Sequence, residues 1–355
     1  MFRHVEIKGT FAMEECLIKN WCRHFEEFLE ILTRNTQLIS VMCRDLEFCV
    51  GPRRDKPTNN RMCRAIADFL GSQRHLKRAE GVELIRKLAE HNRQSLKHPV
   101  IRQSFDNVHI DKEQALKAAQ TLPTFADLTN LTTLGMEYSL IFENMFPRPS
   151  NDIQTIKRCQ KRVLSKLILN YYCDMEIEDF RGLTSTDWQF LKTLYPDLQV
   201  ELSISTEYPT LRELEFLIVL NMPISQLDYR NDPFDKEIEI NELFDHLLRC
   251  RTNDHLVDLQ LDWKWPIEDF VSTFNPFLHA CRKLKYLKLK IDYSASGIEA
   301  LLESWLENRP PSLKKVIIDV SNTHDEDDYP TSINCTEYVP LLKLAGLNIR
   351  VNFHI

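Results

Sequence analysis

The stretch CRKLKYLKLKIDY, residues 281–293, decides the fold of this chain. Leu284, Leu287 and Leu289 follow the pattern L-x-x-L-x-L, and mostly lysines fill the positions between them. Apolar residues that alternate with polar ones indicate a short strand with one buried face. A single strand of this length is not stable alone, so the pattern predicts further copies that pack beside it.

The pattern recurs along more than half of the chain. A second clear copy, DHLVDLQLDW, begins at Asp254, and looser copies lie on both sides of it. Their central apolar residues follow one another at intervals of 25 to 35 residues. Together these copies predict strands at 133–137, 166–170, 226–230, 258–262, 286–290 and 315–319.

Between the copies the apolar spacing changes to that of a helix. It does so in residues 237–250, 266–281 and 297–311, the last of which ends in two prolines. Strands that alternate with helices pair in parallel, and a repeat of about 30 residues is typical of leucine-rich repeats. The sequence therefore predicts an α/β leucine-rich-repeat solenoid, a horseshoe with a parallel concave sheet and convex helices.

We expect one continuous solenoid with two parts. Residues 121–355 form the leucine-rich-repeat array, and residues 1–120 form degenerate repeats. In the first part, the expected elements are strands around Val5 and Val41, a helix over Met13–Thr33, and helices near Arg61–Leu70 and Gly81–Asn92.

Residues 51–102 of this first part are basic, with 13 Lys+Arg against 5 Asp+Glu. They form either a solvated helical surface or a docking patch for an acidic partner, and their role stays open.

Composition narrows the class of protein. The chain is 43% hydrophobic and 27% charged, with a net charge of −7, which disfavours a general nucleic-acid binder. It has no run of eighteen apolar residues and no signal-peptide pattern, so we expect no membrane association and a cytoplasmic or nuclear location. Its 10 cysteines are then expected to be free thiols. Three of them, Cys159, Cys250 and Cys281, are predicted at helix ends.

No catalytic or cofactor-binding motif stands out. The chain has only 8 glycines and lacks phosphate-binding loops, nucleophile elbows, paired zinc-binding histidines and C-x-x-C pairs. The acidic tract NTHDEDDYPTS, residues 322–332, lacks the spacing of a calcium loop. We therefore expect no enzyme, no metal and no cofactor; an enzyme with a dispersed site is the least favoured alternative.

The outward residues of the predicted concave sheet are the candidate site. Their mixed charges suit a protein partner better than a lipid or a small molecule. Replacing Lys288 or Asp262 by Ala is expected to leave the fold nearly unchanged. Trp263 and Trp265 are expected in the core, with a rim position as the alternative. The candidate partner-binding residues are Glu137, Asn170, Arg230, Asp258, Asp262, Tyr286, Lys288 and Lys290.

Three longer stretches resemble a known family. TSTDWQFLKTLYPDLQVELSI from Thr184, FNPFLHACRKLKYLKLKI from Phe274 and ALLESWLENRPPSLKKVIIDV from Ala300 are similar to the leucine-rich-repeat half of F-box proteins. The group that contains F-box only protein thirty-nine is the most similar. The resemblance covers most of residues 120–320.

The resemblance implies a substrate receptor of an SCF-type (Skp1–cullin–F-box) ubiquitin ligase, which acts in protein ubiquitination without catalysing it. Family members begin with an F-box that binds Skp1, and no F-box pattern precedes the strand-like FRHVEIKG at the start of this sequence. We therefore expect a monomer that holds a protein target on the concave face and binds Skp1 only if an F-box precedes Met1 in the full gene product. The alternative is a leucine-rich-repeat interaction scaffold with no role in ubiquitination.

Overall fold

A computed structural model describes the chain in separate stretches. Contacts divide the chain into two compact units, the first comprising Met1–Ile168 with Phe190–Leu198 and the second Leu169–Gln189 with Gln199–Ile355. The expected boundary at residue 120 lies inside the first unit. The described residues are 4–8, 23–24, 26–31, 34, 40–44, 65, 69, 78–80, 98–101, 130–138, 163–172, 177–206, 210–231, 238–292, 297–321 and 329–354.

The first unit contains a run of parallel strands. Each strand pairs with the next along the chain, and the expected strands around Val5 and Val41 are confirmed. Helical residues 23–24 and 26–31 fall within the expected helix Met13–Thr33, and helical residues 65 and 69 fall within the helix expected near Arg61–Leu70. The other positions of these two helices, and the helix expected near Gly81–Asn92, lie outside the described residues. The strands are β1 (His4–Lys8), β2 (Ser40–Arg44), β3 (Arg78–Glu80), β4 (His98–Ile101) and β5 (Thr133–Glu137).

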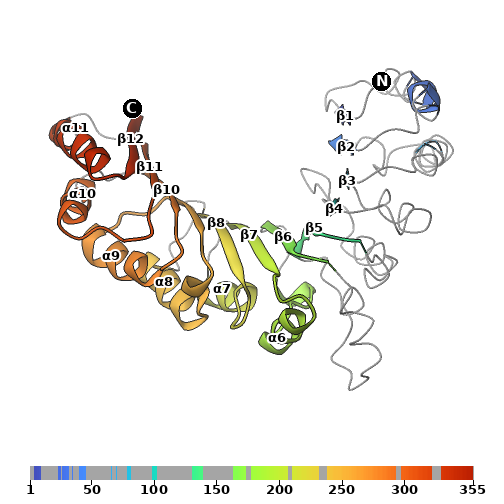
Figure 1. Ribbon diagram of the computed structural model, residues 1–355, viewed down its shortest axis with the longest axis horizontal. Coiled ribbons are helices and arrows are strands. Elements are labelled where there is room, and N and C mark those ends of the chain that lie inside the picture. The colour runs from blue at the N-terminus through green and yellow to red at the C-terminus, as the bar shows by residue number, and fades with distance from the viewer. Residues whose placement is uncertain are drawn as a thin grey trace. The chain divides into compact units, whose positions relative to one another are not determined.

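The second unit alternates strands with helices in a regular order (Figure 1). Its strands pair in parallel, each with the next along the chain. They are β7 (Gln199–Thr206), β8 (Ile224–Asn231), β9 (Asp258–Trp263), β10 (Tyr286–Asp292), β11 (Lys315–Ser321) and β12 (Asn348–His354). The helices between them are α7 (Leu211–Leu217), α8 (Ile240–Arg249), α9 (Phe270–Ala280), α10 (Ile298–Glu307) and α11 (Tyr329–Leu344).

Two further elements span the division between the units. Strand β6 (Lys166–Tyr172) and helix α6 (Ser185–Leu194) each contribute residues to both. With them, all six strand positions expected from the leucine pattern are confirmed, as is an α/β fold with parallel strands in chain order.

The register of the sheet explains the spacing of the sequence copies. Leu287 pairs with Leu259 on one side and with Val316 on the other, and all three are at most 1% exposed. Successive paired positions from β7 to β12 lie 25, 32, 28, 29 and 33 residues apart. Because inward residues recur at matching positions, each strand continues the apolar layer of its neighbour.

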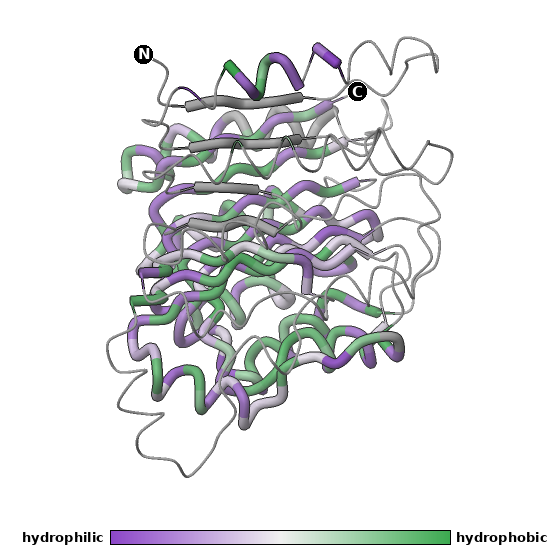
Figure 2. The backbone as a smooth tube through the Cα atoms, turned by 90° about the vertical axis from the view of Figure 1, so that its right-hand side faces the viewer, coloured by the Kyte–Doolittle hydropathy of each residue, from purple (hydrophilic) through white to green (hydrophobic). Residues whose placement is uncertain are grey.

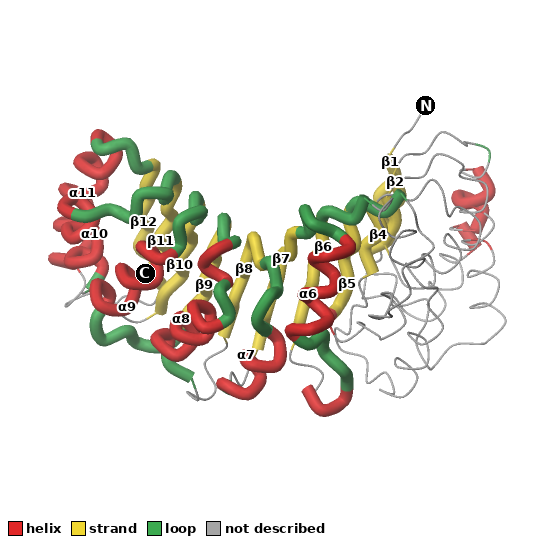
Figure 3. Tube along the Cα trace, turned by 60° about the horizontal axis from the view of Figure 1, so that its bottom comes forward, coloured by secondary structure: helices red, strands yellow, loops and turns green. Residues whose placement is uncertain are grey.

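Helices α8 to α11 cover one side of strands β9 to β12, as Figures 1 and 3 show. Hydrophobic and hydrophilic residues are interspersed along the described tube and do not form separate blocks (Figure 2). They mix because each element buries only one of its faces. In helix α8 the buried face consists of Ile240, Leu243, Phe244 and Leu247. Phe244 stacks on Phe277 of the next helix, with ring centroids 4.3 Å apart.

The predicted cysteine positions at helix ends are confirmed where the structure describes them. Cys250 and Cys281 are the C-cap residues of α8 and α9, and both thiols are buried. Burial raises the pKa of both thiols, that of Cys281 to about 12. Arg251, directly after Cys250, has a φ of 57°, so the chain turns sharply there toward the next strand. Cys159 lies outside the described residues.

Candidate functional site

The face of the sheet opposite the helices carries the polar residues of strands β7 to β12. We call it the open face and define it by three rows of residues that pair across the strands. Row one is Glu201, Gln226, Asp258, Tyr286, Lys315 and Asn348. Row two is Ser203, Asp228, Gln260, Lys288, Ile317 and Arg350. Row three is Ser205, Arg230, Asp262, Lys290, Asp319 and Asn352.

Most of the predicted site residues are brought together on this face. Asp258 and Tyr286 belong to row one, Lys288 belongs to row two, and row three holds Arg230, Asp262 and Lys290. All six are at least partly exposed, while the leucines between them are buried. The inward–outward assignment of these strands is therefore confirmed.

The other two predicted residues do not offer exposed side chains. Glu137 at the end of β5 is 4% exposed, and Asn170 in β6 is 7% exposed. Both strands bury consecutive residues at these positions, so strict alternation of buried and exposed residues stops there. A partner that touches the open face would find little area on either side chain.

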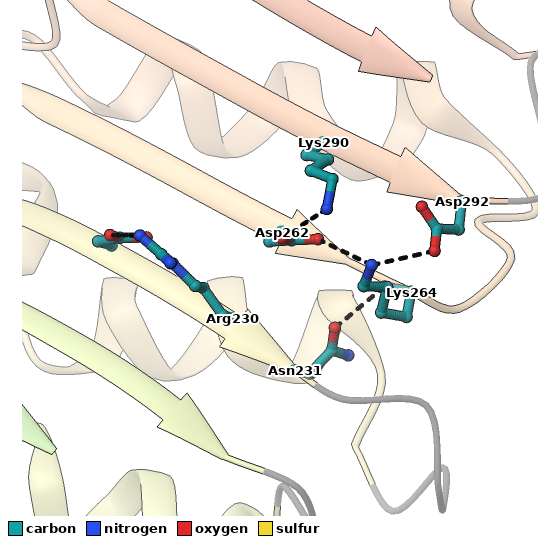
Figure 4. Close-up of polar contacts among 7 residues, drawn as sticks. Arg230, Asn231, Asp262, Lys264, Lys290 and Asp292 are labelled. Atoms are coloured by element: carbon teal, nitrogen blue, oxygen red, sulfur yellow. Dashed lines mark hydrogen bonds and ion pairs between the residues drawn. The ribbon is translucent and has the colours of Figure 1, made fainter. Parts of the chain in front are cut away.

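A chain of ion pairs begins in row three and joins two neighbouring repeats (Figure 4). Lys290 donates to the Asp262 carboxylate at 3.1 Å, and the Lys264 ammonium lies 3.6 Å from the same carboxylate and 3.1 Å from that of Asp292. Burial opposes the charged form of Lys264, but the hydrogen bond to Asp292 and the attraction of both carboxylates outweigh it and raise its pKa. The backbone N–H of Lys264 also donates to the side-chain oxygen of Asn231 at 3.0 Å.

Sequence reasoning did not single out Lys264 or Asp292. Asp292 has an outward position two residues after Lys290, but its side chain is only 7% exposed. Lys264 likewise lies two residues after Asp262. Extending the predicted outward positions by two residues past Asp262 and Lys290 would have found both side chains. Trp263, between them, is buried and stacks on Tyr229 with ring centroids 6.2 Å apart, as expected for the core. Trp265 is half-buried.

On β8 an ion pair forms within a single strand. Arg230 donates to both carboxylate oxygens of Asp228, at 2.7 and 3.2 Å, from the next outward position along the strand. The hydrogen bond to Asp228 is the main cause that raises the pKa of Arg230. Such a two-point contact fixes the guanidinium along the strand.

The first row carries carboxylates on β7 and β9, Glu201 and Asp258. Burial raises the pKa of Asp258, and the negative charges of Glu201 and Asp228 raise it further. On the neighbouring strands Lys315 lies over the Tyr286 ring, with its ammonium 5.1 Å from the centroid. Row one thus passes from carboxylates on β7 and β9 to an aromatic ring and a lysine on β10 and β11.

At the last two strands the outward polar groups bind one another. Asn352 donates to Asp319 at 2.6 Å and accepts from Arg350 at 2.7 Å. Arg350 is exposed and presents its remaining donors on the open face.

A partly buried carboxylate of helix α7 lies away from the open face. Glu213 of α7 accepts hydrogen bonds from Tyr171 at 2.6 Å and from Thr206 at 2.9 Å. Burial raises the pKa of Glu213 despite these bonds. A hollow of about 150 Å³ lies beside the N-termini of α8 and α9, lined by Trp263, Pro266 and Asp269 among others. Its volume suits a few water molecules more than a substrate.

Among the described residues, no group of three or more His, Cys, Asp or Glu side chains could hold a metal ion. In the same part of the chain, no helix has the length and apolar character needed to cross a membrane. A scan against models of protein families finds no match to this chain, and a search of curated proteins finds none either.

Proposed function

We propose that this chain is a non-catalytic protein-recognition module whose parallel sheet belongs to a leucine-rich-repeat horseshoe. The open face binds a protein target, and degenerate repeats of the same kind occupy residues 1–120. The observation that carries this proposal is the open face itself. Its rows run across β7 to β12 with charged and polar side chains, while the opposite face of the same strands is buried under helices.

The dimensions of the open face suit a protein. Six adjacent strands at about 4.8 Å spacing place the outermost strands, β7 and β12, about 24 Å apart, which is the scale of one side of a protein–protein interface. Many polar groups point the same way from rigid strands, so a partner meets a preorganised surface. The described hollow near α8 and α9 is small by comparison and lies on the helix side.

Within this proposal the most specific role is substrate reception for an SCF-type ubiquitin ligase. It rests on the resemblance of residues 184–204, 274–291 and 300–320 to the repeats of F-box proteins. A receptor contributes by holding its target close to a separate enzyme that carries the reactive thioester, so it needs no nucleophile of its own. Skp1 joins only through an F-box, and the role implies a cytoplasmic or nuclear monomer.

An interaction scaffold without a role in ubiquitination is the second candidate. It needs only the open face with its polar rows and does not depend on the resemblance to F-box repeats. Both candidates use the same open face and differ in the fate of the bound target.

Site-specific photo-cross-linking tests the binding face. A photoreactive amino acid at position 260 or 288 places the probe on the open face, and one at position 303 or 307 places it on the exposed side of α10. We expect the same protein to be cross-linked from both open-face positions and from neither control position. Cross-links from α10 alone would contradict the proposed face.

A second measurement separates the two candidates. The cross-linked target is followed in cells that express the full gene product, with and without an inhibitor of cullin activation. Accumulation of the target under the inhibitor is expected for a receptor, and an unchanged level favours the scaffold. Tight co-purification of Skp1 with residues 1–355 alone would place the Skp1-binding segment inside this chain.

A further inference from the structure

Charges of opposite sign are segregated on the open face. Strands β7 to β9 carry four carboxylates and one guanidinium in the three rows, and strands β10 to β12 carry four cationic side chains and one carboxylate. The acidic half contains Glu201, Asp228, Asp258 and Asp262 with Arg230. The basic half contains Lys288, Lys290, Lys315 and Arg350 with Asp319.

Part of this charge is already neutralised within the face. Arg230 binds Asp228, and Lys290 binds Asp262 across the boundary between the halves. The other charged residues of rows one and two are Glu201, Asp258, Lys288, Lys315 and Arg350. Burial raises the pKa of Asp258, and the repulsion of Glu201 and Asp228 raises it further.

Lys288 is the clearest remaining cation on the other side of the boundary. It lies in row two, is half-buried, and forms no ion pair with any residue that the structure describes. Its neighbour Lys315 contacts the Tyr286 ring rather than a carboxylate. A bound anion would therefore find available charge on β10 and β11.

We propose that the open face recognises a protein segment whose charges are divided in the opposite sense, with basic residues over β7–β9 and acidic residues over β10–β12. This inference rests on the proposed function and specifies the kind of target. The centres of the two halves, β8 and β11, are three strand spacings apart, or about 14 Å. An extended segment covers that distance in about four residues, so we expect a basic cluster and an acidic cluster whose centres lie about four residues apart.

The same division argues against a nucleic acid or an anionic lipid surface. Phosphates would be attracted to β10–β12, but the carboxylates of β7–β9 would repel a chain of phosphates that extended across the face. A protein segment can carry both signs and place an apolar or neutral stretch over Tyr286, at the boundary.

Three synthetic peptides of equal length test the proposal with the full chain. One has three basic residues, a single glycine and three acidic residues, so that the centres of its two charged blocks lie about four residues apart; the others replace the acidic block by basic residues or the basic block by acidic ones. Fluorescence anisotropy measures their affinities at low salt. We expect the block-charged peptide to bind roughly tenfold more tightly than either uniform peptide, and to weaken as salt is added.

Charge-reversal variants should change the preferred peptide. Lys288→Glu with Lys315→Glu gives the face a net negative charge in both halves taken together, so the uniformly basic peptide should become the tightest ligand. Glu201→Lys with Asp258→Lys makes the face basic and should favour the uniformly acidic peptide. The matched controls are Lys283→Glu with Lys343→Glu and Glu303→Lys with Glu307→Lys, which change net charge equally at exposed positions away from the open face and should keep the wild-type order.

Circular dichroism and thermal melts on each variant confirm that it is folded before binding is measured. The proposal is overturned if no peptide binds, if a uniform peptide binds the wild-type chain most tightly, or if the controls change the order as much as the open-face variants do. Photo-cross-linking from positions 260 and 288 distinguishes this failure from that of the proposed function. If a target is cross-linked at these positions and the charge-reversal variants still capture it, the open face binds a protein as proposed. Only the proposed division of charges in the target is then wrong.

Discussion

The two faces of strand β10 share one backbone but differ in what they require of their side chains: one face must be apolar and the other must be polar. Leu287 and Leu289 are at most 1% exposed and pair with apolar residues on both neighbouring strands, whereas Lys288 and Lys290 between them reach the open face. On the buried face, any residue of the right size and polarity preserves the sheet. On the open face, the identity of each residue sets charge and hydrogen bonding but hardly affects folding. Selection for fold and selection for binding thus act on alternate residues of one strand.

The strongest test of this comparison is Leu287→Asp. The substitution puts a carboxylate between sheet and helices with no cation to pair it, and it removes a fully buried side chain. We expect a loss of about 4 kcal/mol or more in the free energy of unfolding. Chemical denaturation monitored by circular dichroism measures it.

Leu287→Met is the control, since a volume-conserving apolar change costs less than about 1.5 kcal/mol. Equal losses for the two variants would mean that position 287 is not in the core.

Asn275→Ala tests the polar part of the helix layer. Asn275 of α9 accepts from the Trp305 indole N–H at 2.9 Å and donates to the Ser304 hydroxyl at 3.0 Å, so it joins α9 to α10. Because the Trp305 side chain is 1% exposed, the variant leaves a buried donor unpaired, and we expect a loss of about 2 kcal/mol. Thermal melts compare it with Ser304→Ala, which spares the indole contact and should cost less.

His246 makes the helix side sensitive to pH. Its Nε2–H donates to the Ile218 carbonyl at 2.8 Å, and burial lowers the pKa of the imidazole from its usual 6.5, with Arg249 adding to the effect. In the unfolded chain, His246 therefore becomes protonated near pH 6.5, whereas in the folded chain it stays neutral to lower pH. The free energy of unfolding should fall as pH drops below about 6.5, by at most about 1.4 kcal/mol per pH unit for one proton.

His246→Gln keeps a donor for the Ile218 carbonyl and cannot titrate in this range. Denaturation curves for the variant and the wild-type chain between pH 5 and pH 8 should converge toward acid pH if His246 is responsible. Parallel curves would exclude it.

Asp262→Ala sharpens the comparison on the open face. Alternation alone predicts almost no effect, but the structure places Asp262 between the ammonium groups of Lys290 and Lys264. Its side chain is 22% exposed, so we expect a loss of about 1 kcal/mol. The double variant Asp262→Ala with Lys290→Ala completes a cycle with the single variants. A coupling indistinguishable from zero would show that the pair contributes nothing.

Lys288→Ala should have the smallest effect on folding. Lys288 has no ion pair among the described residues, so the free energy of unfolding should change by under about 0.5 kcal/mol. Its effect on a bound partner should be larger and appear mainly as faster dissociation. A melting temperature lowered as far as by Leu287→Asp would mean that inward and outward positions have been exchanged.

The sequence predicted the helix side of this fold well. Leu259, Leu287 and Val316 could be placed because burial imposes a period of two and each repeat must match its neighbours. The open face was harder to predict from the sequence, because binding a partner, rather than packing within the fold, determines which residues lie there. Glu137 and Asn170 were assigned to it only from the alternation of inward and outward positions. Their burial depends on local packing around β5 and β6, which this alternation does not describe.

The ion-pair chain shows a second limit. Lys264, directly after β9, contacts Asp262 of that strand and Asp292 of the next repeat, and these contacts depend on side-chain rotamers as well as on register. The segregation of charge, by contrast, results from the register and the residue types together. Once the strand pairing is known, it can be read from the sequence.

The order of the strands also determines how the second unit would respond to force. Each strand from β8 to β11 is hydrogen-bonded only to the strands directly before and after it, and neighbouring helices pack in the same succession. Tension applied at Ile355 would thus load the β11–β12 ladder first and detach one repeat at a time. Each event would release 28 to 33 residues, spaced as the paired positions of β9 to β12 are. At about 3.5 Å per extended residue, this gives a sawtooth of steps of about 10 nm. Under tension such a module would lengthen stepwise, and its end-to-end distance would depend on how many repeats remain folded.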